Sequence, residues 1–480
     1  MLTWPTCLIG INFVKYFVWL CAADDIAVSA RLPNGGHAMA TVDSSLNRRD
    51  FLAASAALGC TLATVPEAPS GNAVAPRAQE QPNSDTSLDD NVYTRLLGVR
   101  PHLGAHEHIS RLGGGRMSRE VLNAMAEAND YFVDMRELNA AAGRRAAELL
   151  GAEAAMITAG GFSGMILGAA ACLTGTDEAK AAALPHPTWE RRECLIQTAQ
   201  KFDYDRAYRA AGATIVYADT KADLEARLGP RTAFIAILSA SERQGVFAPP
   251  FAAHRAPPPS AQLVPHEELI AMGKRAGVPV VVDMASDLPP WPQLDRFIKV
   301  GADLLVLSGG KAIGGPQSSG VLLGRRDLID AARLNSTPND NIGRGMKVGK
   351  EEIIGLIVAL ERYVKTDHTA EMERWNMRAR RIVERLQSIP GLEVTYALNT
   401  AGYGDADLTW DEKDIPLNRD SLRRQLADGS PRVELEVIVT QDRGTTTWHA
   451  TARTRVLRDG EELLVARRLR EVFTAARRAD

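Results

Sequence analysis

Hydrophobic and polar residues alternate in two different periods along the chain. The spacing of an amphipathic or buried helix recurs over four segments in its first part, 118–129, 135–150, 165–173 and 266–276. Short apolar runs between and after them predict strands at 155–158, 191–198, 214–217, 232–238, 278–282, 304–307 and 320–323. Runs such as TAFIAIL and VPVVV lack polar interruptions, which is typical of strands buried on both faces of a sheet. Strands that alternate with helices indicate βαβ units and a mostly parallel sheet.

The pattern changes in the last third of the chain. Long helices are predicted at 351–365, 372–387 and 461–476. Residues 433–440 (VELEVIVT) alternate between apolar and charged positions, as in a half-solvated antiparallel sheet. The sequence therefore predicts an α/β protein with a large domain over residues 93–335. Residues 336–480 then form a connecting helix and a smaller C-terminal α/β domain.

The first ninety residues have the composition of a targeting segment followed by a linker. Residues 47–60 read NRRDFLAASAALGC, in which two arginines precede a short apolar run. This order is typical of a twin-arginine export signal, which we assign to residues 39–75. A disordered linker rich in Pro, Ala, Ser, Asn and Asp follows at 76–92. We expect the twin-arginine machinery to deliver a folded protein to the periplasm or the exterior. An amphipathic surface helix with two solvated arginines is the alternative.

A second apolar stretch lies upstream, from Leu8 to Ala23, interrupted by Lys15. Two leaders in tandem are hard to rationalise, whereas Met39 begins a segment of ordinary signal length. We therefore expect translation to start at Met39, so that residues 1–38 are an extension outside the true protein. An N-terminal membrane anchor is the alternative.

Charge and cysteine content narrow the classes of function. The 480 residues carry a net charge of -3. Because there is no basic excess, nucleic acid is not an expected partner. Of five cysteines, only Cys172 and Cys194 lie in the globular part. They make no metal motif, and they are either buried thiols or a single bridge.

A carboxylate and a lysine follow two successive predicted strands. Asp283 ends VPVVVD, and Lys311 lies in the SGGK segment that begins at Ser308. Since ligands bind at the carboxyl ends of parallel strands, both side chains should face one crevice. Pyridoxal phosphate (PLP) needs such a pair: a lysine for the Schiff base and a carboxylate opposite the pyridine nitrogen. The alternative is a helix N-cap and a solvated lysine. Ala312 after Lys311 excludes a P-loop.

The turn TAGGFSG at 158–164 follows a strand and opens a helix. Backbone N–H groups at a helix N-terminus suit a phosphate. Turn formation alone explains such glycines equally well.

Five stretches carry a resemblance to a known family, in the family's own order. They are RLGGGRMSREVLNAM (111–125), ELLGAEAAMITAGG (148–161), VVVDMASDLPP (280–290), GADLLVLSGGKAIGGPQSSGVLLGR (301–325) and GRGMKVGKEEIIGLIVALERY (343–363). The chain resembles fold-type-I PLP enzymes of the seryl-tRNA selenium transferase-like family, which also holds the D-glucosaminate-6-phosphate ammonia-lyase type.

The resemblance implies roles for individual residues. Lys311 would be the Schiff-base lysine and Asp283 the partner of the pyridine nitrogen. The remaining cofactor contacts implied are Gly160, Gly161, Phe162, Ser163, Gln200, Ser308 and Gly315. The segment 315–317 would meet the cofactor of a partner subunit, since this fold forms homodimers or larger assemblies. Arg344 and Lys347 would lie near the substrate entrance, where cations suit an acidic substrate, and ordinary surface residues are the alternative for both. His106 and His108 are candidate substrate contacts from their residue type alone.

Three departures from the family stand out. Gln200 occupies the place of a histidine that lies over the cofactor ring in the family's Q-K-G-H-R-x-x-Y-D stretch. LGAHEHIS at 103–110 replaces the family's I-N-A-x-G-T-x-T. Histidines 102, 106 and 108 are either substrate ligands or solvated loop residues, and no ligand cluster elsewhere indicates a metal. No tRNA-binding domain precedes the body, which argues against tRNA as the substrate.

The sequence therefore predicts a PLP-dependent lyase or transferase acting at the α and β carbons of an amino-acid-like substrate. Transaldimination at Lys311 and α-proton removal come first, and elimination of a β-substituent is the expected outcome by analogy. Selenium transferase-like transfer, aldol cleavage, racemisation and transamination stay open. So does a non-catalytic binding protein that keeps the fold.

Overall fold

The computed structural model describes residues 88–244, 260–287, 292–442 and 445–477, together with four short strands before residue 44. The chain divides into two compact units, residues 1–80 and 81–480. In the first unit two antiparallel pairs form: β1 (Ile9–Phe13) with β2 (Tyr16–Leu20), and β3 (Asp25–Arg31) with β4 (His37–Asp43).

Most of the predicted export signal lies outside the described residues, including all of 47–60. The apolar stretch expected as a leader or an anchor contains β1 and β2. Within the part of the chain that the structure describes, no helix is long and apolar enough to span a membrane. Helix α2 (Val92–Leu97) begins at the last residue of the segment predicted as a linker. The Asn91 side chain caps this helix by accepting from the N–H groups of Tyr93 and Thr94.

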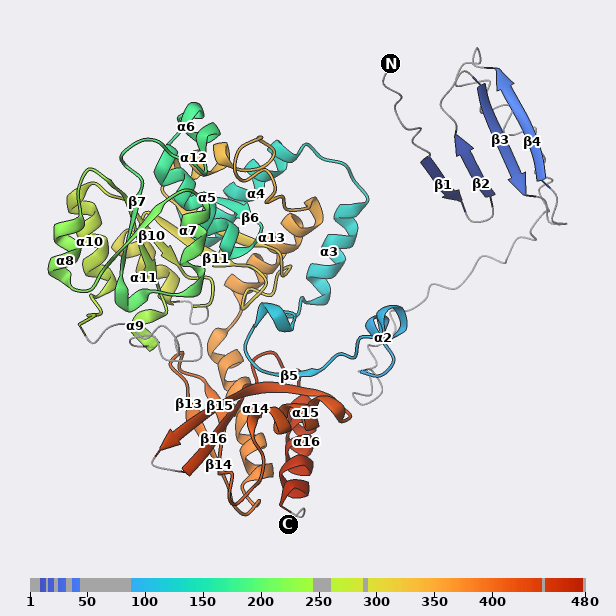
Figure 1. Cartoon of the computed structure of the whole chain (residues 1–480), viewed down its shortest axis with the longest axis vertical. Coiled ribbons are helices and arrows are strands. Elements are labelled where there is room, and N and C mark those ends of the chain that lie inside the picture. Colours follow the sequence, from blue (N-terminus) through green and yellow to red (C-terminus); the bar gives the residue numbers. More distant parts are fainter. Residues whose placement is uncertain are drawn as a thin grey trace, which may run out of the picture. The chain divides into compact units, whose positions relative to one another are not determined.

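A seven-stranded sheet forms the large domain (Figure 1). Its order is β6 (Ala154–Thr158), β12 (Gly320–Gly324), β11 (Leu304–Ser308), β10 (Val280–Asp283), β9 (Thr232–Leu238), β7 (Glu193–Gln197) and β8 (Thr214–Ala218). Neighbouring strands run parallel except at β12, which is antiparallel to both β11 and β6. The predicted mostly parallel α/β sheet is confirmed.

Helices cover both faces of this sheet, which explains the continuous apolar runs. Successive residues of β10, Val280, Val281 and Val282, belong alternately to two separate hydrophobic clusters. The large-domain helices are α3 (Arg119–Asn129), α4 (Met135–Leu150), α5 (Gly160–Thr174), α6 (Glu178–Ala183), α7 (Arg206–Ala210), α8 (Lys221–Arg227), α9 (Ser241–Gln244), α10 (His266–Ala276), α11 (Pro292–Val300), α12 (Arg326–Asn335) and α13 (Lys350–Lys365). Cys172 and Cys194 are free thiols, so the alternative of a bridge is wrong.

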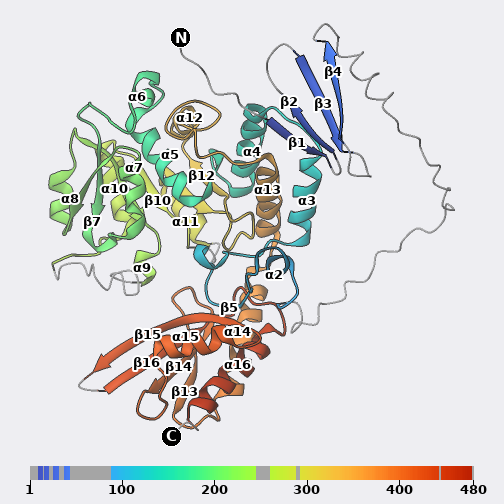
Figure 2. The ribbon, with the colours of Figure 1, turned by 45° about the vertical axis from the view of Figure 1, so that its right-hand side comes forward.

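The small domain has a five-stranded sheet covered by three helices (Figure 2). The strand order is β13 (Leu392–Leu398), β14 (Gly404–Asp411), β16 (Thr445–Ala452), β15 (Val433–Asp442) and β5 (Leu103–Ala105). The helices are α14 (His368–Leu386), α15 (Arg419–Asp428) and α16 (Glu461–Ala476). At its centre the Trp410 ring meets Phe473 edge-on, with 5.0 Å between ring centroids.

The edge strand β5 comes from the N-terminal part of the chain. Its backbone pairs in parallel with the start of β15, so that Leu103 lies opposite Val433. The predicted boundary at residue 93 had placed this segment in the large domain. A three-residue strand with no alternation gives no periodic signal, which is why the sequence did not reveal it. The segment after β5 then crosses directly to the large domain.

Candidate active site

Asp283 and Lys311 lie where the parallel strands of the large sheet end, at the carboxyl-terminal edge of these strands (the sheet edge). Because β10 and β11 are adjacent and parallel, their carboxyl ends open side by side, and Lys311 follows in the turn after β11. Burial raises the pKa of Asp283, and the Lys311 cation opposes that rise. Burial lowers the pKa of Lys311, and the Asp283 carboxylate opposes that fall. The two charges therefore act on each other inside one weakly solvated site.

Gln200 lies beside Asp283. Its Oε1 accepts a hydrogen bond of 2.6 Å from the N–H of Leu238, the residue opposite Asp283 in the pairing of β9 with β10. Three buried polar atoms at this edge have no hydrogen-bond partner among the described residues: Gln200 Nε2, Ser239 Oγ and Tyr208 Oη. Buried polar atoms are normally paired. This edge of the sheet is therefore built to receive a polar group.

The Gly160–Ser163 turn closes on the same edge. Gly160 has φ of 80°, a conformation that favours glycine, and it opens α5. A Cβ added to Gly161 would lie 2.9 Å from the Cβ of Ala285, whose N–H donates to Asp283 Oδ1 over 2.8 Å. The first turn of α5 thus packs against the loop that follows Asp283. Phe162 at this turn is exposed, and its ring meets Tyr204 edge-on.

The glycine-rich loop around Lys311 packs too tightly for side chains. A Cβ on Gly310 would lie 2.3 Å from the Cα of Gln317, and one on Gly309 would lie 2.3 Å from Ser319 Oγ. Gly315 is buried, with its N–H donating to the Gly309 carbonyl over 2.9 Å. This packing fixes the backbone on either side of Lys311.

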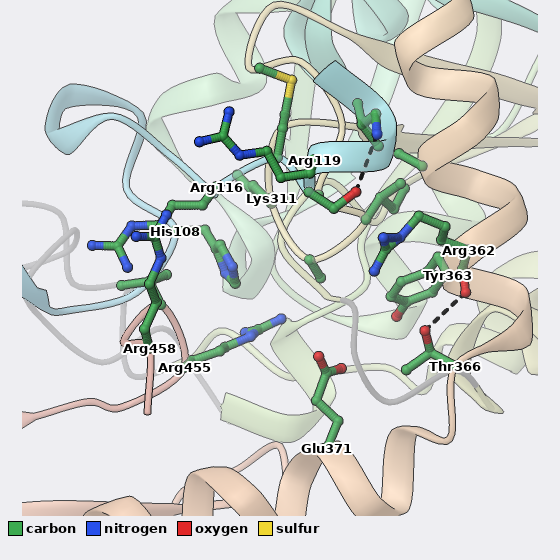
Figure 3. A pocket seen from close by; sticks show the side chains of 18 of the residues that line it. His108, Arg116, Arg119, Lys311, Arg362, Tyr363, Thr366, Glu371, Arg455 and Arg458 are labelled. Atoms are coloured by element: carbon green, nitrogen blue, oxygen red, sulfur yellow. Dashed lines mark hydrogen bonds between the residues drawn. The ribbon is translucent and has the colours of Figure 1, made fainter. Parts of the chain in front are cut away.

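A cavity of about 550 Å³ opens on the other side of Lys311 (Figure 3). Its walls come from the loop before α3, from α3, α13 and α14, and from the loop between β16 and α16. Polar and aromatic residues that line it are His108, Arg116, Ser118, Arg119, Lys311, Arg362, Tyr363, Thr366, Glu371, Trp375, Arg455 and Arg458. The described part of the chain therefore joins the lysine to a cavity shared by both domains.

Arg455 sits in this cavity with only 6% of its side chain exposed. Its Nη1 donates to Glu107 Oε2 and to Tyr403 Oη, each over 3.0 Å, and Tyr403 Oη donates to Glu107 Oε1 over 2.5 Å. Burial opposes ionisation of Glu107, but the neighbouring Arg455 and Arg453 guanidinium groups outweigh it and lower the pKa to about 2. The result is a buried, hydrogen-bonded ion pair beside the lysine.

His108 lines the cavity next to Lys311. A Cβ on Gly115 would lie 2.8 Å from the Lys311 carbonyl oxygen and 3.1 Å from His108 Cδ2, so the loop brings both residues together. Burial and then the Arg455 charge lower the pKa of His108 to about 3. The imidazole is therefore neutral at physiological pH.

His106 is directed elsewhere. Its Nδ1 lies 2.6 Å from the Glu107 carbonyl oxygen and its Nε2 lies 3.0 Å from Nε2 of His102. It is buried and does not line the cavity. The prediction that His106 contacts substrate therefore has no geometric support. Within the described ranges, no group of three or more potential ligands could hold a metal ion.

The structure also leaves Arg344 and Lys347 outside the cavity lining. Both are exposed, and Arg344 Nε lies 3.3 Å from Asp340. Besides Lys311, the cations that line the cavity are arginines at positions 116, 119, 362, 455 and 458, which the sequence did not single out.

Comparisons with known proteins agree with this arrangement. The family model "SelA: L-seryl-tRNA selenium transferase" matches residues 260–388, which include Asp283 and Lys311. A 5'-C-glycyluridine monooxygenase-decarboxylase from Streptomyces is 33% identical over 316 residues, covering 64% of this chain and 74% of the relative. D-glucosaminate-6-phosphate ammonia lyase from Salmonella typhimurium is 25% identical over 396 residues, covering 80% of this chain and 98% of the lyase.

The chain belongs to the selenium transferase and ammonia-lyase family of PLP-dependent enzymes. A solved structure of D-glucosaminate-6-phosphate ammonia-lyase superposes with a TM-score of 0.65 at 24% identity, over 82% of this chain and all of that one, and so shares the fold. Family membership makes the protein a PLP-dependent enzyme.

The residues at the sheet edge fit the family's cofactor. An anionic phosphate suits the N-terminus of α5, and the Asp283 carboxylate suits a protonated pyridine nitrogen. The unpaired atoms of Gln200, Ser239 and Tyr208 offer hydrogen bonds nearby. Ser308, half-buried at the end of β11, lies on the same edge.

Sequence reasoning also missed the partners of Glu107. Arg455 is the last residue of TARTR (451–455) and follows the end of β16, and Tyr403 precedes β14. An arginine and a tyrosine carry no local signal of function, since both are common at surfaces. Only the fold brings them to Glu107.

Proposed function

We propose that the protein is a PLP-dependent lyase or transferase that uses Lys311 as its Schiff-base lysine and acts on an acidic, amino-acid-like substrate. One observation carries the proposal. A lysine with a lowered pKa lies between a buried carboxylate at the sheet edge and a cavity that contains a buried arginine. This arrangement supports cofactor chemistry on one side of the amine and substrate recognition on the other.

PLP, when bound, supplies an electron sink for the electron pair left at the substrate α-carbon. Asp283 would hold the proton on the pyridine nitrogen, because its buried carboxylate gains most from a cationic partner. The α5 turn at Gly160–Ser163 and Ser308 would hold the phosphate, and the Gln200 amide would contact the cofactor from the β7 side.

Recognition of the substrate would start at Arg455. Its guanidinium is oriented by Glu107 and Tyr403 and suits a substrate carboxylate, which takes two parallel hydrogen bonds from arginine. Glu107 balances the buried charge in the absence of substrate.

Lys311 is the group that would move protons at the α-carbon. Its pKa is lowered, so more of it is the neutral amine that can accept a proton, and its ammonium form releases a proton more readily than that of an ordinary lysine. His108 is a poor proton acceptor, because burial and the Arg455 charge disfavour its protonated form. The Gln200 amide does not titrate, so proton transfer assigned to the family's stacking histidine would pass to Lys311.

Loss of a β-substituent is the outcome we favour, by analogy with the ammonia lyase that matches along almost its full length. The first substrate to assay is therefore D-glucosaminate 6-phosphate, followed by amino acids that carry a leaving group at the β-carbon. Release of ammonia and an oxo acid would indicate elimination. Consumption of oxygen with release of CO₂ would instead indicate the reaction named for the Streptomyces relative.

We also propose that the protein acts as a homodimer or larger assembly. Large apolar side chains are exposed at the Gly160–Ser163 turn and in the loop before α4, where Phe132 is completely exposed. An exposed apolar surface of this kind favours association. Light scattering of the purified protein measures the mass, and a monomer would contradict this point.

We also propose that the protein is exported through the twin-arginine pathway, which the NRRDFL motif supports. We expect a fusion of residues 39–75 to a folded reporter to reach the periplasm. Replacement of Arg48 and Arg49 by lysine should retain the reporter in the cytoplasm.

An absorbance spectrum tests the central proposal. The chain from residue 76 onward contains the whole second compact unit and would be purified as wild type and as Lys311→Ala. We expect a visible band of lysine-bound cofactor in the wild type, fixed covalently by borohydride, and no such band in the variant. A wild type that stays colourless after addition of PLP would contradict the proposal.

A further inference from the structure

Three arginines from two distant segments of the sequence line one side of the cavity (Figure 3). Arg116 lies in the loop before α3, Arg119 is the first residue of α3, and Arg458 lies in the loop before α16. All three are exposed at the surface and also line the cavity that contains Lys311. The fold therefore gathers three guanidinium groups around one opening.

One carboxylate, that of Glu461, accepts hydrogen bonds from two of these three arginines. Glu461 accepts from Arg116 Nη1 over 2.9 and 3.1 Å, and the same carboxylate accepts from the backbone N–H of Arg458 over 2.9 Å. This shared contact holds Arg116 and Arg458 close together. In the part of the chain that the structure describes, the guanidinium groups of Arg119 and Arg458 have no carboxylate within 4.0 Å. The group thus keeps an excess of positive charge.

The other cations of the cavity are balanced differently. Arg362, on the opposite wall in Figure 3, pairs with Glu120 over 3.3 Å, and Arg455 pairs with Glu107. Glu371 is an acidic side chain of the lining itself. Among the arginines of the lining, the uncompensated positive charge is therefore on the side opposite Arg362 in Figure 3.

We propose that Arg116, Arg119 and Arg458 bind a terminal phosphate of the substrate, at the end opposite the amino group that reaches Lys311. This inference rests on the proposed function. Three guanidinium groups offer planar pairs of N–H donors, which match the three terminal oxygens of a phosphate. A single carboxylate would need only one of them. The cavity volume of about 550 Å³ also lies within the range of about 300–1,000 Å³ for sites that hold ligands larger than a simple amino acid.

Inorganic phosphate is the probe for this subsite. It would be titrated calorimetrically into the PLP-loaded protein in a phosphate-free buffer, so that the cofactor's own phosphate site is already filled. We expect binding to the wild type, weakened about tenfold in Arg119→Gln and in Arg458→Gln and more in the double variant, because each loses charge-assisted hydrogen bonds.

Two control variants separate a specific site from general charge. Arg344→Gln removes an exposed arginine outside the cavity, and Arg362→Gln removes one from the opposite wall. Both should leave phosphate affinity within about twofold of the wild type. Equal weakening in all single variants would overturn the proposal, as would wild-type affinity in the double variant or no phosphate binding by the wild type.

The visible band keeps this test distinct from that of the proposed function. If the protein is coloured and its phosphate affinity does not change in Arg119→Gln and Arg458→Gln, only the proposed phosphate subsite would be contradicted. A colourless protein would contradict the assigned cofactor chemistry. Titration of that protein would then compare Arg119→Gln and Arg458→Gln with the wild type, because an empty cofactor phosphate site would be common to all three.

Discussion

The two sides of Lys311 are built in different ways. The sheet edge comes from the large domain alone, and its key residues directly follow buried strands. The cavity is assembled from both domains, and its buried Arg455, which follows β16, is held by Glu107 after β5 and by Tyr403 before β14. Cofactor binding is therefore fixed by short local segments, whereas substrate recognition depends on how the domains pack. The cavity side is free to change its substrate without disturbing the other.

The largest effect should come from the residue that joins the two sides. Lys311→Ala removes the Schiff-base amine and a proton-transfer group together. We expect turnover of any substrate found by the panel to fall by roughly 10³-fold or more. Full activity in Lys311→Ala, measured under saturating PLP, would contradict the assignment.

A milder change tests the sheet edge alone. Asp283→Asn keeps the shape of the side chain but removes the charge that would hold the pyridine proton. We expect kcat to fall by roughly 10²-fold while the visible band persists. If the substrate KM rises and kcat does not change, Asp283 contributes to substrate binding and not to the chemistry of the cofactor.

The ion pair of the cavity offers a test on stability. Arg455→Gln leaves the Glu107 carboxylate without its main counter-charge. Because the Glu107 side chain is 24% exposed, we expect a loss of roughly 2–3 kcal/mol, less than the ~3–5 kcal/mol of a fully buried pair. Urea unfolding at pH 7 measures it.

The double variant Glu107→Gln/Arg455→Gln should recover most of that stability without recovering substrate binding. Recovery of both would show that Arg455 has only a structural role. Arg344→Gln breaks an exposed ion pair and should cost at most ~0.5 kcal/mol.

A further effect is a dependence of stability on pH. The folded pKa of His108 is about 3, below its reference value of 6.5, so the unfolded chain binds more protons between these values. Its contribution to the free energy of unfolding is therefore complete above pH 6.5 and is lost as the pH falls toward 3. The pKa of Glu107 is lowered from 4.5 to about 2, so its contribution to the free energy of unfolding is lost as the pH falls below 4.5.

Denaturant unfolding between pH 4.5 and 6.5 measures the histidine part against a background from His266 and from Asp405, whose raised pKa of about 7 acts in the opposite direction. We expect a shallower slope in His108→Asn than in the wild type. Identical slopes would mean that His108 is not buried beside Arg455. Residual slope in the variant is expected from His266, whose pKa burial lowers to about 4.

The sequence predicted the sheet edge well because its signals are local. Val280–Asp283 and Leu304–Ser308 read as strands with polar ends, and helices such as Met135–Leu150 and Glu461–Ala476 have the predicted bounds. Parallel pairing of two such strands then brings Asp283 and Lys311 together without further information.

The cavity could not be predicted in the same way. Arg344 and Lys347 were chosen because they lie in a stretch that resembles the family, yet both are outside the lining. Arg455 and Tyr403 carry no local pattern, and their role depends on a contact with Glu107 across hundreds of residues. That contact exists because β5 joins the C-terminal sheet, which no periodicity reveals.

The edge strand β5 also has a consequence for the order of folding. It is synthesised early, but its partner β15 emerges from the ribosome only near the end of translation. The small domain therefore cannot complete its sheet co-translationally, and its closure is a late, long-range step. Until then the edge of β15 has no neighbour and is open to pairing with other chains. A chain that began after Ala105 would keep that exposed edge permanently, so we expect it to aggregate even with every catalytic side chain in place.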